Sequence, residues 1–101
     1  MPLYQLTMFY STLEEHSDTI RLLRNEVQSI SGENWRVLSA GQDLSAIVFE
    51  TDTAHSELQE RFVRYGDERF MYLLTQISVI VGGCLETGVW QWLDRRLPAG
   101  N

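Results

Sequence analysis

The segment from Arg69 to Gly83 constrains the fold of this chain more than any other. It is the longest apolar, β-branched and aromatic run in the sequence, and it carries no charge after its first residue. Phe70, Tyr72 and Leu74 alternate at period two with the residues between them, which favours a strand over a helix. The glycine pair at its end is typical of a strand terminus. We therefore predict one long strand, or two short ones, around which the rest of the chain packs.

The length and composition indicate a single folded domain. The chain has 101 residues, of which 44% are hydrophobic and 22% charged, and these values are ordinary for a globular protein. A chain of this size can bury enough surface for a core without disulfides. We predict one domain over residues 1–97, followed by a frayed tail at 98–101.

Several features favour a soluble cytoplasmic protein without membrane association. The first residues contain no basic leader, which argues against a signal peptide. Polar residues at Thr75, Gln76 and Ser78 interrupt the apolar run, so it is too short to span a bilayer. A single cysteine, Cys84, excludes an internal disulfide. It has no basic neighbour in sequence, so we predict an inert thiol.

The charge balance makes nucleic acid an unfavourable partner. Eight basic residues face fourteen acidic ones, giving a formal net charge of −6. Affinity for phosphate backbones depends on basic contacts. The aromatic content leaves a single-stranded RNA-binding module as an alternative, because four-stranded sheets can stack bases on exposed rings. The segment Leu44–Phe49 lacks the basic and glycine residues of that module, which weakens this alternative.

The first half of the chain predicts a strand, a helix and a hairpin. Residues 3–10 alternate as a strand, and Ser11 or Thr12 can cap a helix that ends at Gly32. The helix carries an apolar stripe that includes His16. Residues 35–40 and 44–51 read as two strands of a hairpin.

The second half predicts another helix, the long strand and a short last helix. Asp52 or Thr53 caps the second helix, and its inner face is formed by Ala54, Leu58, Phe62 and Tyr65. Thr87 can cap the last helix, with Trp90, Leu93 and Leu97 on one side.

The resulting order, β-α-β-β-α-β, predicts an α+β fold. Right-handed crossovers then give a ferredoxin-like sandwich, a four-stranded antiparallel sheet with two helices on one face and a short C-terminal helical extension. The first and third strands are central in this topology, and the second and fourth are edges. The following residues are expected in the core: Leu6, Met8, Leu23, Val27, Ile47, Phe49 and Phe62.

The stretch from Asp43 to Leu97, together with Trp35, carries a resemblance to a known group. The matching features are Trp35, the sequence Phe49-Glu50-Thr51-Asp52, the helix pattern Ser56-x-Leu58-x-x-x-Phe62, the turn Asp67-Glu68-Arg69, and Trp92-Leu93. In these features the chain resembles small bacterial ferredoxin-like proteins related to the CRISPR adaptation adaptor and to virulence-associated protein D. The resemblance implies the ferredoxin-like fold, dimerisation, and an accessory or regulatory role in a small mobile or defence-related operon.

The resemblance also raises a metal-dependent nuclease as an alternative function. Nuclease members of that group resemble one another in an aspartate at the end of the first strand. Here that position is Tyr10-Ser11-Thr12, and a hydroxyl is a poor replacement for a carboxylate ligand of a hard cation. We therefore expect no catalytic residues, no metal site and no cofactor.

A weak alternative polar site consists of Glu14, Glu15, His16 and His55. Carboxylates and imidazoles can bind a metal or transfer protons. The two histidines lie in different predicted helices without ligand spacing, so we interpret His16 as a boundary or interface residue and the glutamates as helix-cap carboxylates.

Protein interaction is the function favoured over the RNA-binding, nuclease and metal-site alternatives. An uncharged edge strand would promote aggregation if left bare, and a symmetric partner is a simple cover. Two tryptophans in the last helix point to different sides, and Trp92 is expected to be the one left free. We predict a homodimer, with another protein partner as an alternative, and the candidate interface consists of Phe70, Tyr72, Leu74, Ile77, Val79, Val81, Trp90 and Trp92. The chain is thus predicted to be a small acidic interaction or regulatory module.

Overall fold

The computed structural model describes residues 1–78 and 87–96 of the chain. The elements in these residues are β1 (Leu3–Tyr10), α1 (Leu13–Ser31), β2 (Trp35–Ala40), β3 (Leu44–Glu50), α2 (His55–Val63), β4 (Phe70–Ile77) and α3 (Thr87–Asp94). The predicted residues Val79, Val81, Gly82, Gly83, Cys84 and Leu97, with the tail at 98–101, lie outside the described residues.

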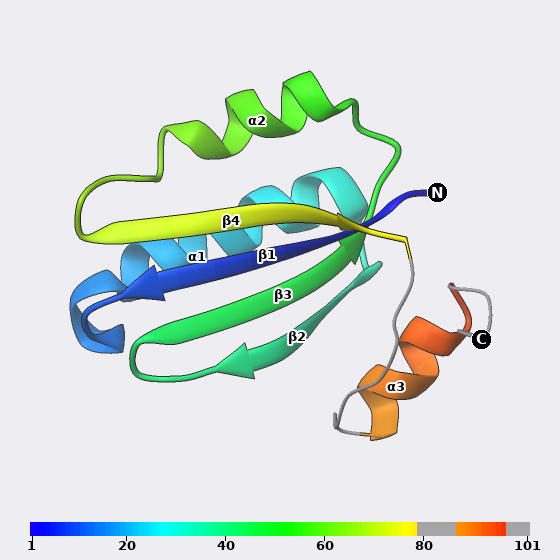
Figure 1. Cartoon of the computed structure of the whole chain (residues 1–101), viewed down its shortest axis with the longest axis horizontal. Coiled ribbons are helices and arrows are strands. Elements are labelled where there is room, and N and C mark those ends of the chain that lie inside the picture. Colours follow the sequence, from blue (N-terminus) through cyan, green and yellow to red (C-terminus); the bar gives the residue numbers. More distant parts are fainter. Residues whose placement is uncertain (79–86, 97–101) are drawn as a thin grey trace.

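The four strands form one antiparallel sheet in the order β2-β3-β1-β4, so the fold is α+β (Figure 1). β1 and β3 are the inner strands, while β2 and β4 are the edges. The part of the apolar run that forms β4, Phe70–Ile77, is therefore at the edge of the sheet.

The predicted helix after β1 is confirmed. The Thr12 hydroxyl accepts a hydrogen bond from the Glu15 N–H at 3.3 Å, so Thr12 is the N-cap. Gly32 ends the helix at a φ of 63°, and its N–H donates to the Gln28 carbonyl at 2.8 Å. Glycine suits this position because other residues rarely adopt a positive φ.

The predicted cap of α2 is wrong. The N-cap residue is Ala54, and no side chain caps this helix. Instead, the Thr53 hydroxyl is hydrogen-bonded to the Thr51 hydroxyl at 2.8 Å, and the buried Thr51 hydroxyl donates to the Ile30 carbonyl at 2.7 Å. These hydrogen bonds connect the segment before α2 to the last turn of α1. They thereby stabilise the turn between β3 and α2.

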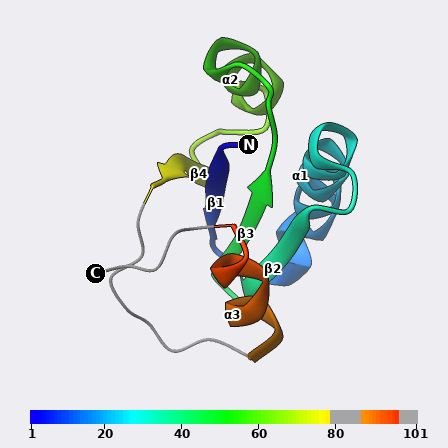
Figure 2. The same cartoon turned by 90° about the vertical axis from the view of Figure 1, so that its right-hand side faces the viewer.

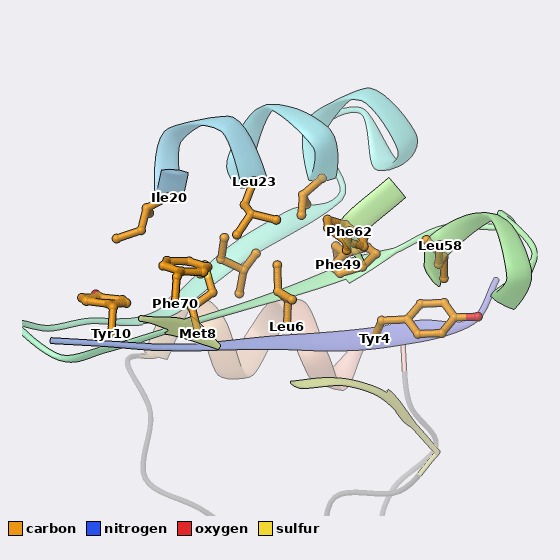
Figure 3. Packing of buried hydrophobic residues seen from close by; sticks show 12 residues of the cluster. Tyr4, Leu6, Met8, Tyr10, Ile20, Leu23, Phe49, Leu58, Phe62 and Phe70 are labelled. Atoms are coloured by element: carbon orange, nitrogen blue, oxygen red, sulfur yellow. The ribbon is translucent and has the colours of Figure 1, made fainter. Parts of the chain in front are cut away.

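The main core lies between the sheet and helices α1 and α2, which cover the same face (Figures 2 and 3). All seven residues expected in the core are at most 1% exposed. Stacked rings extend the core toward the sheet ends, with Tyr4 on Phe49 and Tyr10 on Phe70 at centroid distances of 5.6 and 5.8 Å.

Helix α3 packs on the opposite face of the sheet (Figure 3). A second apolar cluster joins its inner side to β1 and β3, and consists of Leu3, Val48, Val89, Trp92 and Leu93. The sequence predicted Trp90 and Leu93 on that inner side. Leu93 is confirmed, whereas Trp92 replaces Trp90 as the buried tryptophan. Among the described helices, none is long and apolar enough for a membrane span.

Candidate functional site

The outer edge of β4 has no partner strand among the described residues. β4 pairs on one side with β1, in a register from Leu3 opposite Ile77 to Tyr10 opposite Phe70. An edge strand leaves alternate N–H and C=O groups without sheet partners. β4 contains no charged residue and no proline to discourage pairing with another strand. Its outer edge is therefore chemically open to strand addition.

Exposed apolar side chains lie beside this edge, on the sheet face opposite α1 and α2. Phe9 is opposite both Leu44 on β3 and Met71 on β4, so the three form a row across the sheet. Leu73 follows on β4. We call Phe9, Leu44, Met71 and Leu73 the apolar patch; they are 38%, 36%, 58% and 57% exposed.

Helix α3 covers the other end of the same sheet face. It packs near Leu3, Val48 and Ile77, where β1 begins and β3 and β4 end (Figure 1). The apolar patch lies toward the opposite end, near the start of β4. Within residues 1–78 and 87–96, nothing packs over this patch in the way that α3 covers its end of the face.

The side chains of β4 that are available for an interface differ from those predicted from the sequence. Phe70 is 1% exposed and belongs to the main core, while Tyr72 and Leu74 are half-buried against that core. Ile77 packs against the α3 cluster. The exposed apolar side chains of β4 are Met71 and Leu73, which were not predicted as interface residues. Both faces of β4 are apolar, so alternation alone does not indicate which face is buried.

The prediction that Trp92 is free is also wrong. Trp92 is 4% exposed, and two guanidinium groups lie over its ring, that of Arg96 at 3.9 Å and that of Arg36 at 5.7 Å from the ring centroid. The Arg96 side chain also donates to the Asn34 side-chain oxygen at 3.3 Å and pairs with Glu50 at 3.6 Å. These contacts tie α3 to β2 and β3. On the same helix, Trp90 is half-buried.

The weak polar site does not assemble. His16 is half-buried near the end of β1, with its ring 6.0 Å from that of Tyr10, and His55 lies beside Tyr4, with ring centroids 5.8 Å apart. Tyr4 and Tyr10 are six residues apart on one strand, so the histidines are separated by about 20 Å. Glu14 and Glu15 accompany His16 as first-turn carboxylates of α1.

The surroundings of His16 include one carboxylate with a shifted pKa. Hydrogen bonds from the backbone N–H groups of Arg69 and Phe70 lower the pKa of Asp67, and the nearby His16 adds a smaller effect in the same direction. The Asp67 carboxylate thereby fixes the turn into β4. At the end of β1, the Tyr10 hydroxyl is hydrogen-bonded to Ser45 at 2.6 Å. The described part of the chain contains no group of three His, Cys, Asp or Glu residues placed to hold a metal ion.

A half-buried carboxylate links the two helices, and the sequence did not predict it. Glu26 of α1 accepts hydrogen bonds from Arg61 at 3.1 Å, from Tyr65 at 3.0 Å and from Arg64. Its side chain is 12% exposed. Burial alone would raise the pKa of Glu26, but the bonds from Tyr65, Arg61 and Arg64 outweigh it and lower the pKa. The partners are far apart in sequence, so no local spacing indicates this cluster.

Replacing Glu26 with glutamine is expected to lower the free energy of unfolding at pH 7 by about 1–3 kcal/mol, because the charged hydrogen bonds are lost. The folded-state pKa of Glu26 is lowered, so its stabilisation is fully present above the ordinary value of 4.5. It is lost as the pH falls through the folded pKa. Urea unfolding of the unmodified protein and of Glu26→Gln, at pH 7 and at about pH 3, measures the difference in their free energies of unfolding. The difference between them should shrink at the lower pH, and a pH-independent difference would contradict the role of the charge.

Comparison of the chain with models of known protein families, with curated protein sequences and with solved structures found no match. The relation to the small bacterial proteins that the sequence resembles therefore stays a prediction.

Proposed function

We propose that this protein is a non-catalytic interaction module that forms a homodimer through the outer edge of β4 and the apolar patch. One observation carries the proposal: Met71 and Leu73 are more than half exposed on an edge strand that has no charge. Leaving such an edge bare would expose both apolar surface and unpaired backbone groups. A partner that adds a strand covers both.

A second copy of the chain is the partner that the edge fits best. Two copies of β4 can pair antiparallel around a two-fold axis perpendicular to the sheet, which gives an isologous contact. If the axis passes near Leu73, the two Leu73 side chains meet, and both apolar patches lie on one face of a continuous sheet. The chain carries a net charge of −6, but this contact places no charged residue of β4 against another.

The arrangement of elements supports a ferredoxin-like assignment for the module. The succession of β1, α1, β2, β3, α2 and β4 is that of two strand–helix–strand units. The strand order β2-β3-β1-β4, with α1 and α2 on one face, is consistent with this topology. The sequence resemblance described above extends the proposal to an accessory or regulatory role.

The dimer is tested by analytical ultracentrifugation at micromolar concentration. We expect a dimer mass, and a total buried area of at least about 1,200 Å² in a structure of the complex. Replacing Leu73 with aspartate should weaken the dimer at least about tenfold, because a charge would be desolvated at the centre of the contact.

Leu22→Asp is the matched control. Leu22 is also an exposed leucine, at 43%, but it lies on α1. That variant should keep the dimer mass. A monomer mass for the unmodified protein would contradict the proposal, as would a dimer that survives Leu73→Asp combined with Met71→Asp.

A further inference from the structure

A pocket of about 440 Å³ lies between α2 and β4, at the opposite end of β4 from its first residue. This volume is within the range of about 300–1,000 Å³ typical of small-molecule sites. The pocket is lined by Tyr4, His55, Leu58, Gln59, Tyr72, Leu73, Leu74 and Gln76. These residues come from β1, α2 and β4, so the pocket is a product of the tertiary fold.

The lining combines flat rings with neutral polar groups. It contains no Asp, Glu, Lys or Arg. The rings of Tyr4 and His55 meet edge to face, with centroids 5.8 Å apart and an interplanar angle of 82°. Leu58 and Leu74 supply apolar surface, and Tyr72 supplies a third ring. This lining favours a flat, uncharged ligand over a charged one.

The Tyr4 hydroxyl is the most informative polar group of the pocket. Tyr4 is only 3% exposed, yet its hydroxyl makes no hydrogen bond with any residue that the structure describes. Figure 3 shows the ring near Leu58, with the hydroxyl at the end farther from Leu6. The hydroxyl oxygen is not one of the fully enclosed unpaired atoms of the described residues, so it borders the pocket and can donate a hydrogen bond to a ligand there.

The neighbouring polar side chains of the pocket can donate and accept hydrogen bonds. Burial raises the pKa of both Tyr4 and Tyr72, so both phenols keep their protons at neutral pH. The His55 Nε2 atom is hydrogen-bonded to the Gln76 side-chain oxygen at 3.0 Å. This bond orients the Gln76 amide across the gap between α2 and β4. Gln59 adds a second amide.

We propose that this pocket binds an uncharged planar heterocycle that carries hydrogen-bond acceptors, the chemistry of the base of a nucleoside. The exposed ring of His55 and the half-buried ring of Tyr72 provide surfaces for a flat ring. The Tyr4 hydroxyl donates to a ring nitrogen or a carbonyl oxygen, and the glutamine amides read the remaining edge. The acidic chain and the neutral lining disfavour a phosphate on the same ligand.

This site is independent of the proposed dimer, because it is complete within one chain. Leu73 belongs to both the pocket lining and the apolar patch, so a partner strand on β4 would add an outer wall to the pocket. Ligand binding is measured separately from the oligomeric state, and either proposal can fail alone.

The test is a titration of the ¹⁵N-labelled full chain with adenosine and with cytidine, followed by NMR. We expect saturable shifts at pocket residues for at least one nucleoside, with a Kd below about 1 mM. Tyr4→Phe removes only the hydroxyl and should weaken binding about tenfold. Tyr65→Phe makes the same chemical change outside the pocket and should leave the affinity unchanged.

Two further measurements keep the proposal falsifiable. Gln59→Trp fills the pocket from an exposed position of α2, so it should abolish binding while the melting temperature is preserved. Adenosine monophosphate should bind more weakly than adenosine. The absence of saturable binding by either nucleoside, an unchanged affinity in Tyr4→Phe, or tighter binding of the phosphate would overturn the inference.

Discussion

Replacing Phe62 with alanine is expected to lower the free energy of unfolding by about 3–5 kcal/mol. The Phe62 side chain is fully buried under α2, and its ring lies 6.4 Å from that of Phe49 and 6.5 Å from that of Tyr72. Truncation leaves a cavity that the rigid sheet below cannot fill. Domains of this size have total stabilities of about 5–15 kcal/mol, so the loss is a large fraction.

Urea unfolding followed by circular dichroism measures this loss, and the melting temperature should fall by more than about 10 °C. Val63→Ala is the control, since Val63 is the next residue of the same helix and is 59% exposed. Its effect should stay within about 0.5 kcal/mol. Equal effects of the two substitutions would mean that α2 packs with a different face.

We expect the second large effect from replacing Trp92 with alanine. If the whole chain unfolds in one step, this substitution should lower the free energy of unfolding by about 3–5 kcal/mol. The substitution removes the largest side chain of the α3 cluster and the ring that Arg36 and Arg96 contact. An isolated helix as short as α3 is unstable in water, so without this ring α3 should leave the sheet. The rest of the fold can persist after that local loss.

Hydrogen exchange distinguishes local from global loss. In Trp92→Ala the amides of α3 should exchange rapidly, while those of α1 keep their protection. Trp90→Ala is the matched control, because Trp90 lies on the same helix and is only half-buried. Protected α3 amides in Trp92→Ala would contradict the role of Trp92 as the anchor of this helix.

The sequence predicts those parts of the fold in which one face of an element is clearly apolar and the other polar. The stripe of α1, with Leu23 and Val27, identified its buried side correctly. Gly32 correctly marked the end of α1, and the hairpin of β2 and β3 was predicted between the two helices. Local patterns of this kind depend only on periodicity and on backbone conformation.

The wrong or missing predictions concern residues that contact other elements, because local periodicity does not show which element a residue packs against. β4 is apolar on both faces, so the exposed positions Met71 and Leu73 could not be separated from Phe70 and Tyr72 by alternation. Trp90 and Trp92 were separated correctly, but which of them is buried depends on the docking of α3 beside Arg36. Glu26 and its partners Arg61 on α2 and Tyr65 just after it likewise meet only when α1 and α2 pack together. The pocket beside Tyr4 is another product of distant segments.

The central position of β1 has a consequence for the order in which the fold can form. β1 is made before the other three strands of the sheet, but it is paired on one side with β3 and on the other with β4, whose Ile77 lies opposite Leu3. Contacts between such distant segments slow folding, because a long loop must close before they form. During synthesis at about 5–20 residues per second, β1 and β3 leave the ribosome well before β4 and α3. For those seconds one side of β1 and the apolar face around Val48 lack the cover that β4 and α3 give them in the fold, so the nascent chain exposes apolar surface that can aggregate.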